Sequence, residues 1–200
     1  SPSFSPTYLQ DDGNRCFMTN QELFDAVRLY FNDANRNSTL EYGAVIGDWC
    51  VGRVTNMANL FSDYLTFDEP IGDWDVSQVT AMDGMFQYAA SFNQDISSWD
   101  VSLVSDMKNL FYEATAFNQS ISTWDVASVT NMEGLFSFAM SFDQDLSAWD
   151  VSSVVNMTGM FHETPFNHPL ASWNVSSVTD VSYMFSTGTF NRDLSSCDVS

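Results

Sequence analysis

The sequence predicts an α/β solenoid of about six coils, each 24–25 residues long and built from a strand and a helix, behind an N-terminal helical cap. Tryptophan recurs at a nearly fixed period, at residues 49, 74, 99, 124, 149 and 173, with Cys197 at the next step. Within each period the apolar spacing changes from two residues to three or four. A segment without the repeat precedes the first coil, where a stack needs a cover for its apolar end.

The first fifty residues predict a linker followed by the cap. Residues 1–15 are polar and rich in Pro and Ser, so we expect a flexible linker there. Thr19 and Glu22 form a capping box, and Leu23, Val27 and Tyr30 follow at helical spacing, which predicts a helix over 20–32. We therefore expect residues 16–50 to form the cap together with a degenerate first coil.

Each coil is expected to open with a short strand. Ile96, Trp99 and Val101 have the L-x-x-L-x-L spacing of a leucine-rich repeat, with Trp in place of the central Leu. This spacing predicts a strand over 98–102, with Trp99 and Val101 turned inward. The expected fold is therefore a right-handed solenoid of leucine-rich-repeat type.

The second part of each coil predicts a helix and a return loop. Val104, Met107, Leu110 and Phe111 form one apolar helical stripe, which predicts an outer layer of short helices. In the return loop a Phe precedes each Trp position by seven residues and is followed by Asn or Asp. We expect these polar side chains to bond backbone groups of their own and the next coil, namely Asp68, Asn93, Asn118, Asp143, Asn167 and Asn191.

The charge balance excludes some partners. Asp and Glu outnumber Lys and Arg by 26 to 6, a formal charge of −20. Such a surface repels nucleic acid phosphates and anionic lipid heads, so we expect no nucleic acid partner. It suits cations, basic proteins or neutral glycans, although the charge also serves solubility alone. No apolar run is long enough to span a membrane, so we expect no membrane insertion in this segment.

Cysteine and asparagine residues point to an extracellular location. Cys16 and Cys50 bracket the segment without the repeat and predict a disulfide, which leaves the pairing of Cys197 open. Four sequons predict glycosylation, at Asn37, Asn118, Asn156 and Asn174. Together these features predict a secreted or cell-surface glycoprotein. Because Ser200 falls in mid-repeat, we expect the repeats of residues 51–200 to continue in a longer chain.

The repeat phrase resembles a known family. The string F-N-x-x-I-x-x-W-D-V-S-x-V-T-x-M-x-x-M-F, over about residues 44–200, is similar to the BspA-like leucine-rich repeats, the 25- or 26-residue surface-protein repeats. The segment before Trp49 resembles the N-terminal cap of algal members. The resemblance implies a surface protein of adhesion or partner binding and no enzymatic activity.

The side chains that the core does not need form outward columns beside each Trp. We predict that they bind an extracellular protein or glycan; they are Asp73, Asp75, Ser98, Asp100, Ser102, Thr123, Asp125, Asp150, Ser152 and Asn174. Carboxylates one strand spacing apart, about 4.8 Å, repel each other by roughly 0.9 kcal/mol in water and about 3.5 at an effective dielectric of 20. Hydrogen bonds from Ser or the backbone, bound Ca²⁺, or donors of a partner would each compensate for this repulsion.

We expect an interaction module and not an enzyme. The Asp column is uniform, whereas acid–base catalysis needs neighbouring groups in unequal environments. His162 and His168 occur once, in a loop, and we interpret them as surface residues; a metal pair with Glu163 is the alternative. We expect no cofactor. A structural cell-wall or adhesive spacer and a Ca²⁺-dependent binding module stay open as alternative functions.

Overall fold

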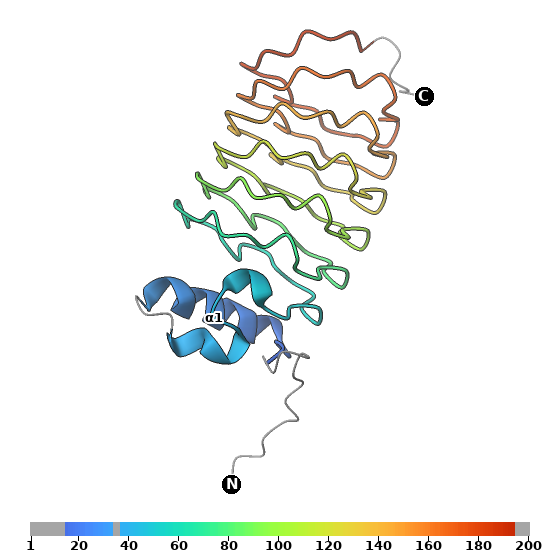
Figure 1. Ribbon diagram of the computed structural model, residues 1–200. Coiled ribbons are helices and arrows are strands. Elements are labelled where there is room, and N and C mark those ends of the chain that lie inside the picture. The colour runs from blue at the N-terminus through green and yellow to red at the C-terminus, as the bar shows by residue number, and fades with distance from the viewer. Residues whose placement is uncertain (1–14, 34–36, 195–200) are drawn as a thin grey trace.

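The computed structural model describes residues 15–33 and 37–194, so most of the predicted linker and Cys197 lie outside the described residues. Its helical elements are α1 (Asn20–Asn32), η1 (Asn37–Tyr42) and η2 (Ile46–Asp48). They gather at one end, and the rest of the described chain winds into a stack of similar coils (Figure 1). None of the helices in the described ranges is long and apolar enough to cross a membrane.

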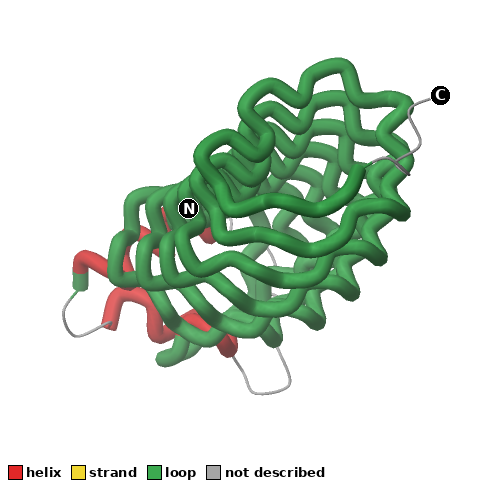
Figure 2. The backbone as a smooth tube through the Cα atoms, turned by 90° about the horizontal axis from the view of Figure 1, so that it is seen from above, coloured by secondary structure: helices red, strands yellow, loops and turns green. Residues whose placement is uncertain are grey.

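The predicted leucine-rich-repeat-type solenoid of strand–helix coils is wrong. From residue 51 to 194 the coils consist of turns and loops, with neither a helix nor a strand (Figure 2). Isolated parallel bridges join successive coils, and they run through Asn56, Ala81, Asp106, Asn131, Asn156 and Asp180. The coils are therefore held to one another by single bridges and hydrogen bonds, and not by a sheet with an outer layer of helices.

The segment expected to be helical is a series of turns that we call the turn ladder, residues 57–64 and their equivalents in each coil. Asn59 and Asp63 have φ of 59° and 66°, a left-handed conformation that an α-helix excludes. Every second N–H donates to the next coil, as from Met57 to the carbonyl of Ala81 at 2.9 Å. The N–H groups between them close four-residue β-turns, such as the turn in which Leu60 donates to Met57. Apolar residues three apart are buried in such turns as they are in a helix, so the spacing does not separate the two structures.

The segment expected to be a strand is a pair of tight turns. The N–H of Trp99 donates to the carbonyl of Ile96 at 3.1 Å, and the N–H of Val104 donates to that of Val101 at 2.9 Å. The inward direction predicted for two of these side chains is confirmed, because Trp99 and Val101 are buried. Side-chain direction was therefore predictable here without the correct backbone.

Stacked phenylalanine rings form the centre of the core. Phe61 lies face to face with Phe67 at 4.0 Å between centroids, and Phe86 with Phe92 at 3.9 Å. Each pair also stacks on the next, as Phe61 does on Phe86 at 5.8 Å. Two parallel ring columns therefore run through the stack, and burial of this continuous apolar surface is the main favourable term in folding.

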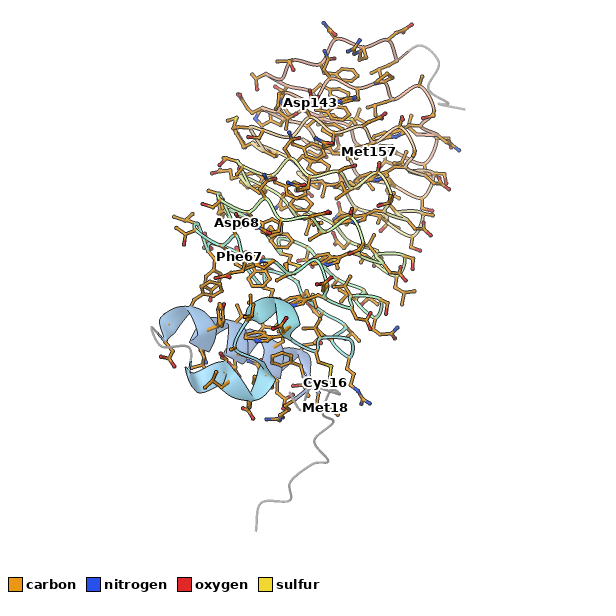
Figure 3. The ribbon with its side chains drawn as sticks, in the orientation of Figure 1. Cys16, Met18, Phe67, Asp68, Asp143 and Met157 are labelled. Atoms are coloured by element: carbon orange, nitrogen blue, oxygen red, sulfur yellow. A yellow bond between two sulfur atoms is a disulfide. The ribbon has the colours of Figure 1, made fainter. Side chains whose placement is uncertain are left out.

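The bonds predicted between the Asn or Asp side chains and the backbone of the next coil are confirmed, and we call this series the Asn ladder. The Oδ1 of Asp68 accepts the N–H of Asn93 at 2.8 Å, and the Oδ1 of Asn93 accepts that of Asn118 at 2.9 Å. The same bond continues through Asp143 and Asn167. Asp68 and Asp143, its two acidic members, lie at different heights of the stack (Figure 3).

The helix predicted over 20–32 is confirmed as α1, and it covers the first coil. Thr19 Oγ1 accepts the N–H of Glu22 at 3.2 Å, and Glu22 reaches back to the N–H of Met18 at 2.7 Å. The ring of Phe31 on α1 meets that of Phe67 edge to face at 5.8 Å. The predicted disulfide between Cys16 and Cys50 is also present, at the same end (Figure 3).

Candidate functional site

The predicted binding residues lie together on one side of the stack, around each buried Trp, and we call this surface the Asp/Ser face. It comprises Asp73, Asp75, Ser98, Asp100, Ser102, Thr123, Asp125, Asp150, Ser152 and Asn174. The carboxylates are exposed, whereas the Ser residues that follow them are half-buried. Because successive coils stack in register, one carboxylate or amide follows the Trp of each coil along this face, and Asp73 adds a second in the coil of Trp74.

Each carboxylate that directly follows a Trp closes a local turn. The Oδ1 of Asp100 accepts the N–H of Ser102 at 3.1 Å and its hydroxyl at 2.6 Å. Asp75 has the same two bonds with Ser77. Asn174 has them with Ser176, so an amide supports this turn as well as a carboxylate does. Hydrogen bonds from Ser and the backbone, one of the three compensations expected from the sequence, are therefore present.

These hydrogen bonds favour the charged form of two carboxylates of the face. The Ser102 hydroxyl and, after it, the Ser102 backbone N–H lower the pKa of Asp100 below its ordinary value. Ser152 lowers the pKa of Asp150 in the same way. A hydrogen bond to the ionised form favours that form, so these carboxylates remain anionic throughout the physiological range.

The hydroxyls of the neighbouring column donate within the protein. Ser98 Oγ donates to the carbonyl of Gly72 at 2.8 Å, and Thr123 Oγ1 donates to that of Ser97 at 2.8 Å. Since a hydroxyl has a single donor hydrogen, neither has one left for a ligand. The Asp/Ser face therefore presents acceptors, and a partner has to supply the donors.

Asp73 and Asp75 line a hollow of about 340 Å³ at the cap end of the face, which the sequence analysis missed. Asp48 lies on its wall, and Gly47 and Gly52 leave it open. A Cβ added at Gly52 would lie 2.7 Å from Asp75 Oδ2, so a side chain there would displace this carboxylate. The sequence signal for this hollow is Gly52, which lacks the side chain that Ser77 and Ser102 have at the equivalent position of later coils.

The two histidines bond different neighbouring coils. Nδ1 of His162 lies 3.0 Å from the carbonyl oxygen of Ser186 in the following coil. Nε2 of His168 lies 3.0 Å from the carbonyl oxygen of Asp143 in the preceding coil. Across the described ranges, no group of three or more His, Cys, Asp or Glu side chains is arranged to hold a metal ion.

The sequon asparagines differ in their surroundings. Asn118 is exposed, and its Oδ1 accepts the N–H of Asp143 at 3.0 Å as part of the Asn ladder. Asn156 is half-buried, and its Nδ2 donates to Glu133 at 3.2 Å. Asn174 is half-buried on the Asp/Ser face, and the side chain of Asn37 lies outside the described residues. Asn118 is thus the most accessible of the three that can be compared.

The chain was compared with known families and proteins. A family profile with the description "Mycoplasma protein of unknown function, DUF285" matches residues 26–137 and, a second time, residues 118–200. The two matches include every coil that carries the Asp/Ser face. None of the curated proteins and none of the solved structures compared with the chain matches it. Since the matches cover far more than half of its length, the chain belongs to the DUF285 family.

Proposed function

We propose that the protein is a non-catalytic interaction module, secreted or displayed on a cell surface, that binds an extracellular protein or glycan through the Asp/Ser face. The main support for this proposal is that the face offers hydrogen-bond acceptors and few free donors. One carboxylate follows the Trp of each coil from Asp75 to Asp150, and hydrogen bonds from Ser lower the pKa of two of them, Asp100 and Asp150. The hydroxyls of the face donate internally, as those of Ser98 and Thr123 do. Lys or Arg side chains of a protein, or the hydroxyls of a sugar, supply the donors that such a surface lacks.

The location in this proposal rests on the cap. A disulfide between Cys16 and Cys50 and the lack of a membrane-spanning helix in the described residues are compatible with an extracellular protein. Disulfides persist in oxidising compartments and are rare in the cytosol of most organisms. We further infer, from the repeat phrase, that these coils are related to the BspA-like surface-protein repeats.

The test changes the charge of the face and keeps its turns. Asn replaces Asp in the triple variant Asp100→Asn, Asp125→Asn and Asp150→Asn, because Asn174 supports the same turn in the last coil. Wild type and variant are compared on protein and glycan arrays, and their unfolding midpoints in urea show whether both are folded. We expect weaker binding by the folded variant. Unchanged binding would move the site away from the Asp/Ser face.

A structural spacer is the rival function, and a specific observation favours it. The hydroxyls and Asn side chains of the coils link neighbouring coils and stiffen the stack, as Ser98 and Asn93 do. A spacer has no saturable ligand, so a titration that shows no saturation with any captured protein or glycan would support it against the interaction module.

A further inference from the structure

A second set of side chains, none of which belongs to the Asp/Ser face, forms a row of aromatic rings that the proposed function does not use. Tyr88, Tyr112, Phe138 and His162 come from four successive coils and are all half-buried. Each ring meets the next edge to face, with centroids 5.5, 5.8 and 4.8 Å apart. We call this row the aromatic ridge.

The ridge results from a two-coil alternation in the sequence. Tyr88 and Phe138 stand fourteen residues after their Trp, whereas Tyr112 and His162 stand thirteen residues after theirs. The two residues at position fourteen have φ of 61° and 59°, a conformation that is unusual for bulky side chains. The core does not require an aromatic residue at this position, because Thr187 occupies it in a later coil with φ of 58°.

Carboxylates flank the ridge at every second coil. Glu113 and Glu163 take position fourteen in the two coils whose ring stands at position thirteen. Burial raises the pKa of Tyr112, and the charge of Glu113 and a hydrogen bond to it add to this rise. Lys108 is the one Lys or Arg between residues 54 and 191, and it already pairs with Glu133 at 3.0 Å. Between residues 54 and 191 the coils therefore offer no further Lys or Arg to these two carboxylates.

The spacing of the ridge matches one backbone conformation. If the coils repeat at the usual distance between parallel bridged chains, two coils span about 9.6 Å. A polyproline-II helix rises about 3.1 Å per residue with three residues per turn, so equivalent side chains recur about every 9.3 Å. Aromatic surfaces are the usual docking sites of such segments, and Arg both stacks on aromatic rings and pairs with carboxylates.

We propose that the aromatic ridge binds an extended polyproline-II segment of a partner protein that carries Arg or Lys at every third residue. Each cationic group packs against a ridge ring and pairs with Glu113 or Glu163, while the proline rings between them contact the remaining aromatic surface. This interaction is independent of the Asp/Ser face, because the two surfaces share no residue.

The test uses two synthetic peptides with the same composition. One repeats Arg-Pro-Pro four times, and the other places four Arg before eight Pro. Fluorescence anisotropy of labelled peptides measures the dissociation constant for the full chain at two salt concentrations. We expect the evenly spaced peptide to bind more tightly. Equal affinity for the two peptides, or no binding of the evenly spaced one, would overturn the proposal.

Variants taken from equivalent coils assign the binding to the ridge. Tyr112→Gln introduces the side chain that Gln87 has at the equivalent position of the preceding coil. Phe138→Thr introduces the side chain that Thr187 has at the equivalent position of a later coil. We expect each to weaken binding of the spaced peptide about two- to five-fold, as expected for loss of an exposed cation–π contact.

Two controls separate the ridge from general attraction to an acidic protein. Leu103→Gln changes an exposed residue outside the ridge to the residue that Gln78 supplies in the preceding coil, and it should leave affinity unchanged. The triple Asp→Asn variant of the Asp/Ser face should keep the preference for the evenly spaced peptide. Loss of that preference in the triple variant, with full binding by the ridge variants, would contradict the proposal.

Discussion

The indole Nε1 of Trp124 donates a hydrogen bond of 3.1 Å to the main-chain carbonyl of Ile96, in the coil before its own. The same bond recurs between Trp99 and Ile71 and between Trp149 and Ile121. A ring that fills the core thus also satisfies a buried backbone acceptor of its neighbour. This double role explains why Trp, and not another large apolar residue, recurs at the position.

Trp124→Phe tests this relationship. The substitution keeps an aromatic ring but removes one of the two hydrogen bonds to the carbonyl of Ile96, which keeps the N–H of Trp99 as a donor. Loss of one hydrogen bond costs about 0.5–1.5 kcal/mol. We expect the free energy of unfolding in urea to fall by at least this amount, because the smaller ring also loses packing. Thr123→Val is the control: it removes an exposed bond to Ser97, and we expect a change within about 0.5 kcal/mol.

Gly134 and Gly159 form a matched pair for a second stability test. Both have left-handed φ, of 61° and 62°, but a Cβ at Gly134 would collide with Asn109 Oδ1, whereas one at Gly159 meets no heavy atom closer than 3.9 Å. A left-handed non-glycine residue costs roughly 1–2 kcal/mol, so Gly159→Ala should lower stability by about that much. Gly134→Ala should cost about 0.5–1.5 kcal/mol more, because the Asn109 side chain has to leave its position.

A double variant shows whether Asn109 is the cause of this difference. Asn109→Gly combined with Gly134→Ala removes the colliding amide. Measured against the single variant Asn109→Gly, the added Gly134→Ala should then lower the free energy of unfolding in urea only as much as Gly159→Ala lowers that of wild type. Equal losses of stability in Gly134→Ala and Gly159→Ala would contradict the close contact between the Asn109 amide and Gly134.

The Asp turns predict how stability depends on pH. The folded-state pKa of Asp100 and of Asp150 lies below the ordinary value of 3.8, so the unfolded chain binds protons more readily at these sites. Their contribution is therefore complete well above pH 3.8 and is lost as the pH falls through the depressed pKa values. Asp100→Asn with Asp150→Asn keeps the turns and removes the titration.

The measurement compares wild type and double Asn variant in urea at intervals from pH 7 to pH 3. The difference between their free energies of unfolding should be constant above pH 5 and should shift against wild type in the acidic range. A difference that is independent of pH down to 3 would show that Ser102 and Ser152 do not stabilise the charged form.

Glycosylation is predicted to favour Asn118 over Asn156. Asn118 is exposed, whereas Asn156 is half-buried with its amide bonded to Glu133. Asn118→Asp removes the sequon and keeps the Asn ladder, since Asp68 and Asp143 already serve there. When the chain is secreted from eukaryotic cells, mass spectrometry should find glycan at residue 118 and lose it in this variant. A glycan on Asn156 with Asn118 unmodified would contradict the ranking.

The correctly predicted parts depend on local signals. The capping box of Thr19 and Glu22 predicted α1, and the position of Cys16 and Cys50 around the cap predicted the disulfide. The periodic Phe and Trp residues predicted which side chains are buried. Each of these inferences depends on residue type and spacing alone, and both are visible in a sequence.

The backbone of the coils was not predictable from apolar spacing. Val104, Met107 and Leu110 are three residues apart, which suits both a helix and a series of β-turns. The deciding residues are those with positive φ, such as Asn109 and Glu113, and Glu gives no sign of that conformation in a sequence. Between-coil hydrogen bonds then replace the helical ones, and this is a property of the stack and not of one coil.

The residues of the candidate site were predicted from the sequence, but their hydrogen bonding was not. The outward direction of Asp100 and Thr123 followed from the repeat. That Thr123 donates to Ser97 of the preceding coil required the stacking of coils, as did the hollow beside Gly52. Because these bonds consume the hydroxyl donors, the structure changes the expected face from a mixed polar surface to one of acceptors.

The most direct test of the interaction module is a titration with the partner that the arrays identify. Wild type and the folded triple variant Asp100→Asn, Asp125→Asn and Asp150→Asn are titrated by isothermal calorimetry at the same salt concentration, with Leu103→Gln as control. We predict saturable binding to wild type and to the control, and a dissociation constant at least tenfold higher for the triple variant. Equal dissociation constants for all three proteins would contradict a binding role for the Asp/Ser face.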